Sequence, residues 1–190
     1  AHLLEKFDVR TLYTNGDKLD GMVWKLINDK NIKWKNISNV KEPITSRDIN
    51  LDIMRPGVGF HIDDSSLPYP VAFKLTYGNS SFLFGESLNQ ISFQRELIHS
   101  FDEKIKTRIA YIPNIKMEGS LFEFLESVSP EILVTGNSSE SSDLYNQELL
   151  SLKEQTVILE IDNIGAVAFT TKGEEINGRT FIDEKYIVLH

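Results

Sequence analysis

The stretch Val71-Ala-Phe-Lys-Leu-Thr-Tyr-Gly-Asn-Ser-Ser-Phe-Leu-Phe84 indicates the fold of this chain more directly than any other. Aromatic and aliphatic residues fill both of its ends, and Gly78-Asn79 separates them at the centre. A Gly-Asn pair between two such runs is typical of a tight β-hairpin turn. We therefore predict strands over residues 71–77 and 80–84, paired antiparallel as a hairpin.

After this hairpin, helical and strand patterns alternate along the chain. We expect helices over 89–101, 120–128 and 144–154, and strands over 108–112 and 131–135. The first of these helices has Ile91, Leu97 and Ile98 on one face, and the second starts with the capping-box spacing of Ser120 and Glu123. Alternation of this kind predicts a sheet whose faces are covered by helices.

The regions on either side add further strands and a second hairpin. Before residue 71 we expect helices over 1–7 and 21–30, and strands over 9–13 and 51–54. Towards the end we expect a hairpin formed by 157–161 and 166–170, and a last strand at 186–189. The predicted fold class is therefore layered α/β, with a mixed sheet that contains β-hairpins.

The composition restricts the class of protein. At 190 residues, with 41% hydrophobic and 25% charged residues, the chain suits one globular domain, residues 1–190. It has no cysteine, which excludes disulfides, cysteine-based zinc sites and thiol nucleophiles. Its 28 acidic and 20 basic side chains leave a net charge of −8, which argues against sequence-independent coating of nucleic acid. A local basic patch is still compatible with nucleic-acid binding.

The sequence contains no membrane or secretion signal. No apolar run approaches the roughly 18 residues needed to span a bilayer, and the start lacks the basic and apolar regions of a signal peptide. We therefore predict no membrane contact by this chain itself and leave its compartment open. The first residues, 1–7, look like an amphipathic helix entered in the middle, so we expect a chain that begins inside a larger protein.

Several segments resemble, in this order, parts of a known hydrolase fold. They are Leu3–Tyr13, the hairpin of residues 71–84, the strand Ile109-Ala-Tyr-Ile-Pro113, the helix–Pro–strand unit Glu123–Val134 and the closing hairpin Asp162–Gly173. Together they resemble the second half of a metallo-β-lactamase-fold hydrolase, most closely the C-terminal hydrolase domain of ComEC-type DNA-uptake competence proteins. The resemblance implies a layered αββα sandwich, of which this chain is the C-terminal portion, without the N-terminal part that carries the His-rich motif.

The resemblance also implies where metal ligands would stand, and this chain has other residues there. The family uses one or two ions, usually zinc or manganese, to activate water against an ester bond, which needs several His and Asp ligands. The Asp after the first hairpin falls on Glu86 or Ser87, and the first His of the His-His-Gly motif falls on Asn114. The His-x-His-x-Asp-His motif would lie before Ala1. We therefore predict no metal cofactor, and zinc or manganese only if that motif is present upstream.

Two other clusters of residues could carry chemistry. His61-Ile-Asp-Asp64 combines an imidazole with carboxylates, but we favour a turn stabilised by its Asp side chains. Basic side chains near Trp24 and Trp34 could bind single-stranded nucleic acid, although we favour a solvated helix face with both tryptophans in the core. The basic residues of this candidate patch are Lys25, Lys30, Lys33, Lys35, Lys41 and Arg47.

Three functions stand as alternatives. The first is a degenerate metallo-β-lactamase-like, ComEC-type domain: a non-catalytic binding or structural module in DNA uptake or processing, with DNA or another protein as partner. The second is a fragment of an active metal-dependent hydrolase or nuclease whose ligands lie upstream of Ala1. The third is a nucleic-acid-binding module that uses Lys25–Arg47. The substituted ligand positions favour the first, so we lean against enzymatic activity for this chain.

The implied fold carries an expectation about packing. A chain without the first half of the sandwich would leave the inner face of its sheet exposed, and a large exposed apolar face needs a cover. We expect a homodimer, an upstream segment or a rearranged packing to supply it.

Overall fold

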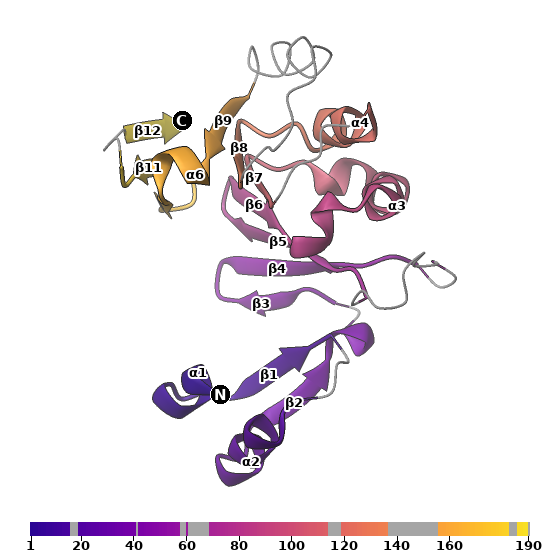
Figure 1. Cartoon of the computed structure of the whole chain (residues 1–190), viewed down its shortest axis with the longest axis vertical. Coiled ribbons are helices and arrows are strands. Elements are labelled where there is room, and N and C mark those ends of the chain that lie inside the picture. Colours follow the sequence, from indigo (N-terminus) through magenta and orange to yellow (C-terminus); the bar gives the residue numbers. More distant parts are fainter. Residues whose placement is uncertain are drawn as a thin grey trace. The chain divides into compact units, whose positions relative to one another are not determined.

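The computed structural model describes residues 1–15, 19–40, 42–57, 60, 69–113, 119–136, 156–182 and 186–189. The chain divides into two compact units, Ala1–Glu42 with His61–Tyr69, and Pro43–Phe60 with Pro70–His190. Figure 1 shows the helices and strands of both. The helix predicted over 144–154 lies outside the described residues. The prediction that residues 1–190 form one domain, without the N-terminal part of the fold, stays a prediction.

The first unit is a small β-α-β arrangement. Its elements are α1 (His2–Lys6), β1 (Thr11–Thr14), α2 (Gly21–Asp29), β2 (Lys33–Asn36) and the 3₁₀-helix η1 (Ile37–Asn39). α2 begins after Asp20, whose carboxylate accepts a hydrogen bond of 2.6 Å from the Met22 amide and so stabilises the start of the helix. β1 and β2 pair in parallel, as a helical crossover requires, over a core of Leu4, Ile27 and Ile32.

A seven-stranded mixed sheet is the centre of the described part of the second unit. Its strands follow one another in chain order: β3 (Ile44–Ser46), β4 (Ile49–Met54), β5 (Ala72–Tyr77), β6 (Ser80–Phe84), β7 (Ile109–Ile112), β8 (Ile132–Thr135) and β9 (Val157–Glu160). β3 to β6 pair antiparallel, and β6 to β9 pair in parallel. The fold is therefore mixed α/β with a large mixed sheet that contains β-hairpins, as predicted.

The hairpin predicted over residues 71–84 is confirmed as β5 and β6. Tyr77 pairs with Ser80 across the turn, and Gly78 adopts a φ of 56°, a conformation that glycine reaches without steric cost. The hairpin of β3 and β4 was not predicted. Its turn contains Arg47, which also has a positive φ of 53°, in place of the glycine that sequence reasoning looks for.

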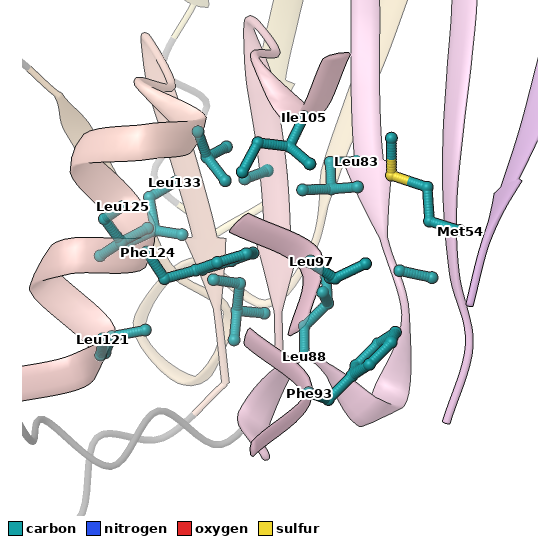
Figure 2. Packing of buried hydrophobic residues seen from close by; sticks show 14 residues of the cluster. Met54, Leu83, Leu88, Phe93, Leu97, Ile105, Leu121, Phe124, Leu125 and Leu133 are labelled. Atoms are coloured by element: carbon teal, nitrogen blue, oxygen red, sulfur yellow. The ribbon is translucent and has the colours of Figure 1, made fainter. Parts of the chain in front are cut away.

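Two helices cover one face of the large sheet. They are α3 (Ile91–Phe101) and α4 (Gly119–Val128). The 3₁₀-helices η2 (Glu86–Asn89) and η3 (Asp102–Ile105) join α3 to β6 and to β7. Figure 2 shows Leu97 from α3 and Phe124 from α4 among side chains of the strands, such as Leu83 and Leu133. All four are almost fully buried, and each such side chain contributes about 1.5–3 kcal/mol.

A second, three-stranded antiparallel sheet lies against the opposite face of the large sheet (Figure 1). Its strands are β10 (Val167–Thr171), β11 (Ile176–Thr180) and β12 (Tyr186–Leu189). Ile176 from this sheet packs with Ile109, Ile132 and Val134 of the large sheet. Strands β6 to β8 are therefore covered by helices on one side and by a small sheet on the other.

The prediction of a second hairpin, formed by residues 157–161 and 166–170, is wrong. β9 pairs with β8 in the large sheet, whereas β10 pairs with β11 in the small sheet. Between β9 and β10, the short helix α6 (Ile161–Ile164) ends at Gly165, whose φ of 74° redirects the chain from one sheet to the other. A turn of this kind resembles a hairpin turn in sequence, because both use a glycine of positive φ.

Two turns hold the small sheet to the large one. The amide of Asn79, in the β5–β6 turn, donates a 2.5 Å hydrogen bond to the Gly173 carbonyl, in the β10–β11 turn. The hydroxyl groups of Ser80 and Thr171 are also hydrogen-bonded, at 2.6 Å. A Cβ on Gly78 would overlap the carbonyl group of Gly173, so the two turns meet only because residue 78 has no side chain.

Replacing Gly78 by alanine is expected to lower the free energy of unfolding by about 3 kcal/mol, because the new methyl group strains a positive φ and separates the two turns. Urea unfolding of purified wild type and Gly78→Ala measures this loss. The matched control is Gly21→Ala, because Gly21 has a helical position and a methyl group added there would meet no atom within 4 Å. That change should alter stability by less than about 1 kcal/mol. Equal effects of the two substitutions would contradict the turn-to-turn contact.

The guanidinium group of Arg108 connects the same two sheets through hydrogen bonds. Its Nη2 donates to Glu131 Oε2 at 3.0 Å, and its Nε donates to the other oxygen of that carboxylate. Its Nη1 donates to the Glu174 carbonyl at 2.8 Å. The hydrogen bonds that Arg108 donates to the Glu131 carboxylate raise the pKa of Arg108 above its usual value. The guanidinium side chain is only 15% exposed, so this planar, two-pronged pair is shielded from water on one side.

Replacing Arg108 by methionine should therefore cost about 2 kcal/mol of stability, since it removes charge-assisted hydrogen bonds to Glu131 and to Glu174. Thermal and urea unfolding would report the change. Lys106→Met is the control, because Lys106 pairs with Glu103 in a bridge whose side chains are 52% and 72% exposed. An exposed bridge of this kind is worth less than about 1 kcal/mol. If Arg108→Met lowered stability no more than Lys106→Met, the contacts of Arg108 would not be a structural connection between the two sheets.

Candidate functional site

The carboxyl end of β6 leads into the segment where the resemblance places an Asp ligand. At Gly85 the chain passes so close to β5 that a Cβ would lie 2.7 Å from the Val71 carbonyl oxygen. η2 follows at once, with Glu86 exposed and Ser87 only 8% exposed. The two residues that could occupy the ligand position are thus in opposite environments. Glu86 meets solvent, and Ser87 is packed inside.

The side chains described near this edge do not form a metal centre. Asn114, the other position matched to a ligand, lies outside the described residues. In the part of the chain that the structure describes, no group of three or more His, Cys, Asp or Glu side chains is placed to hold a metal ion. Catalytic zinc takes about three protein ligands, and Glu86 supplies one carboxylate. The described donor set therefore does not fit the family's metal chemistry.

The acidic side chain on α3 has a structural role. Oε1 of Glu96 accepts hydrogen bonds from the Gly57 amide at 3.1 Å and from the Ser100 hydroxyl at 2.8 Å. These bonds, the one from Gly57 first, lower the pKa of Glu96, and the nearby His99 adds to the shift. Glu96 thereby ties α3 to the loop after β4. The cluster His61-Ile-Asp-Asp64 lies outside the described residues.

The lysines of the candidate nucleic-acid patch have different environments in the first unit. Nζ of Lys30 donates to the carbonyl oxygens of Leu4 and Glu5, at 2.5 and 2.9 Å, and so joins the end of α2 to α1. Lys25 is exposed on α2. The ammonium group of Lys30 is therefore hydrogen-bonded within its own unit, whereas Lys25 forms none of the described ion pairs.

Lys33 and Lys35 share one face of β2, because residues two apart on a strand point the same way. Across the sheet they pair with Thr11 and Tyr13, and Nζ of Lys35 lies 5.8 Å from the centre of the Tyr13 ring. Both lysines are exposed. This face of the two-stranded sheet thus presents two ammonium groups beside an aromatic ring, which we call the lysine face (Lys33, Lys35 and Tyr13).

The two tryptophans lie at the surface, so the interpretation that both are packed in the core is wrong. Trp24 is 39% and Trp34 41% exposed, and their rings pack edge-on with centres 5.2 Å apart. Nε1 of Trp34 donates to the Thr14 hydroxyl at 3.0 Å. The buried core of the first unit is small, so the two indole rings pack against each other at the surface and shield part of each other from solvent. Of the remaining patch residues, Lys41 lies outside the described residues and Arg47 belongs to the second unit.

The face of the large sheet opposite α3 and α4, which we call the open face, carries apolar side chains from β3 to β9, with Ser46 and Ser80 as polar exceptions. Strand alternation and register place these side chains on it: Ile44, Ile49, Leu51, Ile53, Phe73, Leu75, Tyr77, Phe82, Phe84, Ile109, Tyr111, Ile132, Val134, Val157 and Leu159. The small sheet covers part of this face. Four side chains of the open face remain well exposed to solvent: Ile49 is 42%, Phe84 37%, Tyr111 36% and Val157 46% exposed. The small sheet of this chain thus covers part of the face, and the expected homodimer, upstream segment or rearranged packing stays a prediction.

Sequence reasoning missed that this face is covered by a second sheet, although a signal was present. Ile109-Ala-Tyr-Ile112 and Ile132-Leu-Val134 are continuous apolar runs without polar alternation, which is typical of parallel strands buried on both faces. The sequence of β11 gave no such signal, because it is not a continuous apolar run: Asn177, Gly178 and Arg179 lie between Ile176 and Thr180. Gly178 is required there, since a Cβ would lie 2.9 Å from the Phe169 ring.

No protein-family model and no curated protein sequence matches this chain. A solved structure that is similar is a Thermotoga maritima protein, assigned to the Zn-dependent hydrolases of the metallo-β-lactamase superfamily. It is 8% identical and covers 80% of this chain and 81% of its own, with a TM-score of 0.41. A similarity of this size says nothing about activity. No described helix is long and apolar enough to cross a membrane.

Proposed function

We propose that this chain is a degenerate metallo-β-lactamase-like domain of the ComEC type, which acts as a non-catalytic binding or structural module. The observation that carries the proposal is the carboxyl end of β6, where Glu86 is exposed and Ser87 is buried. A ligand loop for zinc or manganese needs donors that converge on one point and leave an open position for water. One carboxylate facing solvent gives weak, exchangeable contact with a cation.

Two surfaces support a binding role. The open face presents aromatic and aliphatic side chains, and apolar patches of this kind mark interaction sites in soluble proteins. The lysine face of the first unit offers positive charge and an aromatic ring. A second copy of this chain or an upstream segment would suit the open face, and DNA would suit the lysine face, as expected of a module in DNA uptake or processing.

The metal content and hydrolytic activity of the purified chain test the proposal. After incubation with zinc or manganese and gel filtration, we expect well below one ion per chain, and no metal-dependent cleavage of bis-p-nitrophenyl phosphate or of DNA. Glu86→Gln should leave both readings unchanged, because Glu86 alone holds no ion. An active metallohydrolase of similar size serves as the positive control.

The alternative, a fragment of an active metal-dependent hydrolase with ligands upstream of Ala1, makes a different prediction for the longer chain. Stoichiometric metal with metal-dependent cleavage, in this chain or in one extended upstream, would replace the proposal by this alternative. A loss of that activity in Glu86→Gln would then identify Glu86 as a ligand.

The lysine face favours a second candidate function, the binding of single-stranded nucleic acid. Lys33 and Lys35 flank an aromatic ring on an exposed strand, and bases stack on such rings while ammonium groups contact phosphates. The first unit, residues 1–42 and 61–69, carries 8 basic and 8 acidic side chains, so the net charge of −8 belongs to the second unit. Nucleic acid would therefore meet its most favourable potential on this unit.

Fluorescence anisotropy with a labelled oligo(dT) measures this binding at several salt concentrations. Lys33→Gln with Lys35→Gln should weaken binding and reduce the slope of log affinity against log salt by about 1.4, since two phosphate contacts are lost. Lys104→Gln with Lys106→Gln removes the same charge from an exposed site in the second unit. Equal weakening by both pairs would show that net charge alone is responsible, and would remove this candidate.

A further inference from the structure

A pocket lies where the open face of the large sheet meets the small sheet. Its volume is about 320 Å³. Phe82, Ile109 and Val134 form its wall on the large sheet, and Val167 and Phe169 of β10 form the facing wall. The rings of Phe82 and Phe169 approach to 6.4 Å between centres and close the space between the two walls.

The mouth of the pocket is made by two exposed aromatic side chains. Phe84 and Tyr111 are neighbours on paired strands and are 37% and 36% exposed. Phe84 is held in place by stacking on Phe73, with ring centres 5.7 Å apart. Gly165 also lines the pocket, and its φ of 74° turns the chain from α6 towards β10 there. The walls therefore come from elements whose positions are set by the fold of this unit.

The chemistry of the lining defines the ligand. None of the described lining residues carries a charge, and the Tyr111 phenol is the one polar side chain among them. Pockets of about 300–1,000 Å³ with an apolar lining and few polar groups are typical of small-molecule sites. A charged ligand would lose its hydration here and find no counter-charge.

We propose that this pocket binds a small neutral ligand, with an aromatic or aliphatic body and one hydrogen-bonding group for Tyr111. The body lies between the ring of Phe84 and the side chain of Val167, and the hydrogen-bonding group faces the Tyr111 hydroxyl at the mouth. The site belongs to the second unit alone. It shares Phe84 and Tyr111 with the open face, so a partner on that face would compete with the ligand, whereas the metal and hydrolysis tests of the proposed function do not depend on this site.

The probe is N-phenyl-1-naphthylamine, a neutral amine with two aromatic groups whose fluorescence rises in apolar surroundings. We expect saturable binding at one site per chain. The sulfonated analogue 8-anilino-1-naphthalenesulfonate has the same aromatic body and a negative charge, and it should bind at least about tenfold more weakly. Equal affinity for the two probes, or the absence of saturation with the neutral one, would overturn the proposal.

Matched substitutions locate the bound probe. Val167→Phe fills the pocket from β10, whereas Ala168→Phe adds the same ring on the outward face of the same strand, where Ala168 is exposed. Phe84→Ala removes one wall, and Phe181→Ala removes a phenylalanine, 62% exposed, that does not line the pocket. The first member of each pair should lower affinity about tenfold, and the second should change it less than twofold.

Circular dichroism and urea unfolding check that each variant folds. Because Val167→Phe adds volume to a packed strand, Phe84→Ala provides an independent reading if the first variant unfolds. Equal loss of affinity within either pair, or no loss in Phe84→Ala, would show that the probe binds elsewhere on the open face.

Discussion

The structure of the second unit depends on one constraint, which is that strands β6, β7 and β8 are apolar on both faces. Leu83, Ala110 and Leu133 point to one side, and Phe82, Ile109 and Ile132 point to the other. Each of these side chains is worth roughly 1.5–3 kcal/mol when it leaves water, apart from the smaller alanine. The sheet must therefore have two covers. The helices α3 and α4 supply one, and β10 to β12 supply the other.

The second cover is attached by contacts that a hydrophobic pattern does not encode. Backbone from two distant turns meets at Gly78 and Gly173, and Arg108 joins Glu131 to the Glu174 carbonyl. These polar contacts fix where the small sheet sits, and the apolar contacts behind them provide most of the free energy. The offset between the two sheets leaves the pocket beside Phe84, so the same packing that stabilises the unit also shapes its candidate binding site.

The functional interpretation follows from what this packing does to the edge of the sheet. The carboxyl ends of parallel strands are where α/β folds usually place chemistry. Here the segment after β6 is used to pack Ser87 inside and to start the 3₁₀-helix that leads to α3. The segment after β6 thus contributes to the packing of this unit, and the partners proposed above would meet the open face of the large sheet or the lysine face of the first unit.

Much of this could be predicted from residues alone, where the cause is local. The hairpin of Val71–Phe84, the helix that begins after Asp20 and the strand Ile109–Ile112 depend on turn residues, caps and periodicity within a few positions. The resemblance placed a ligand position at Glu86 or Ser87, and this placement stays a prediction. What only the tertiary structure decided depends on residues far apart in the chain. Gly165 looked like a hairpin glycine until the partners of β9 and β10 were seen, and Trp24 and Trp34 looked like core residues. The sheet to which a strand belongs and the burial of a side chain depend on contacts between residues far apart in the chain. A local sequence pattern does not encode those contacts.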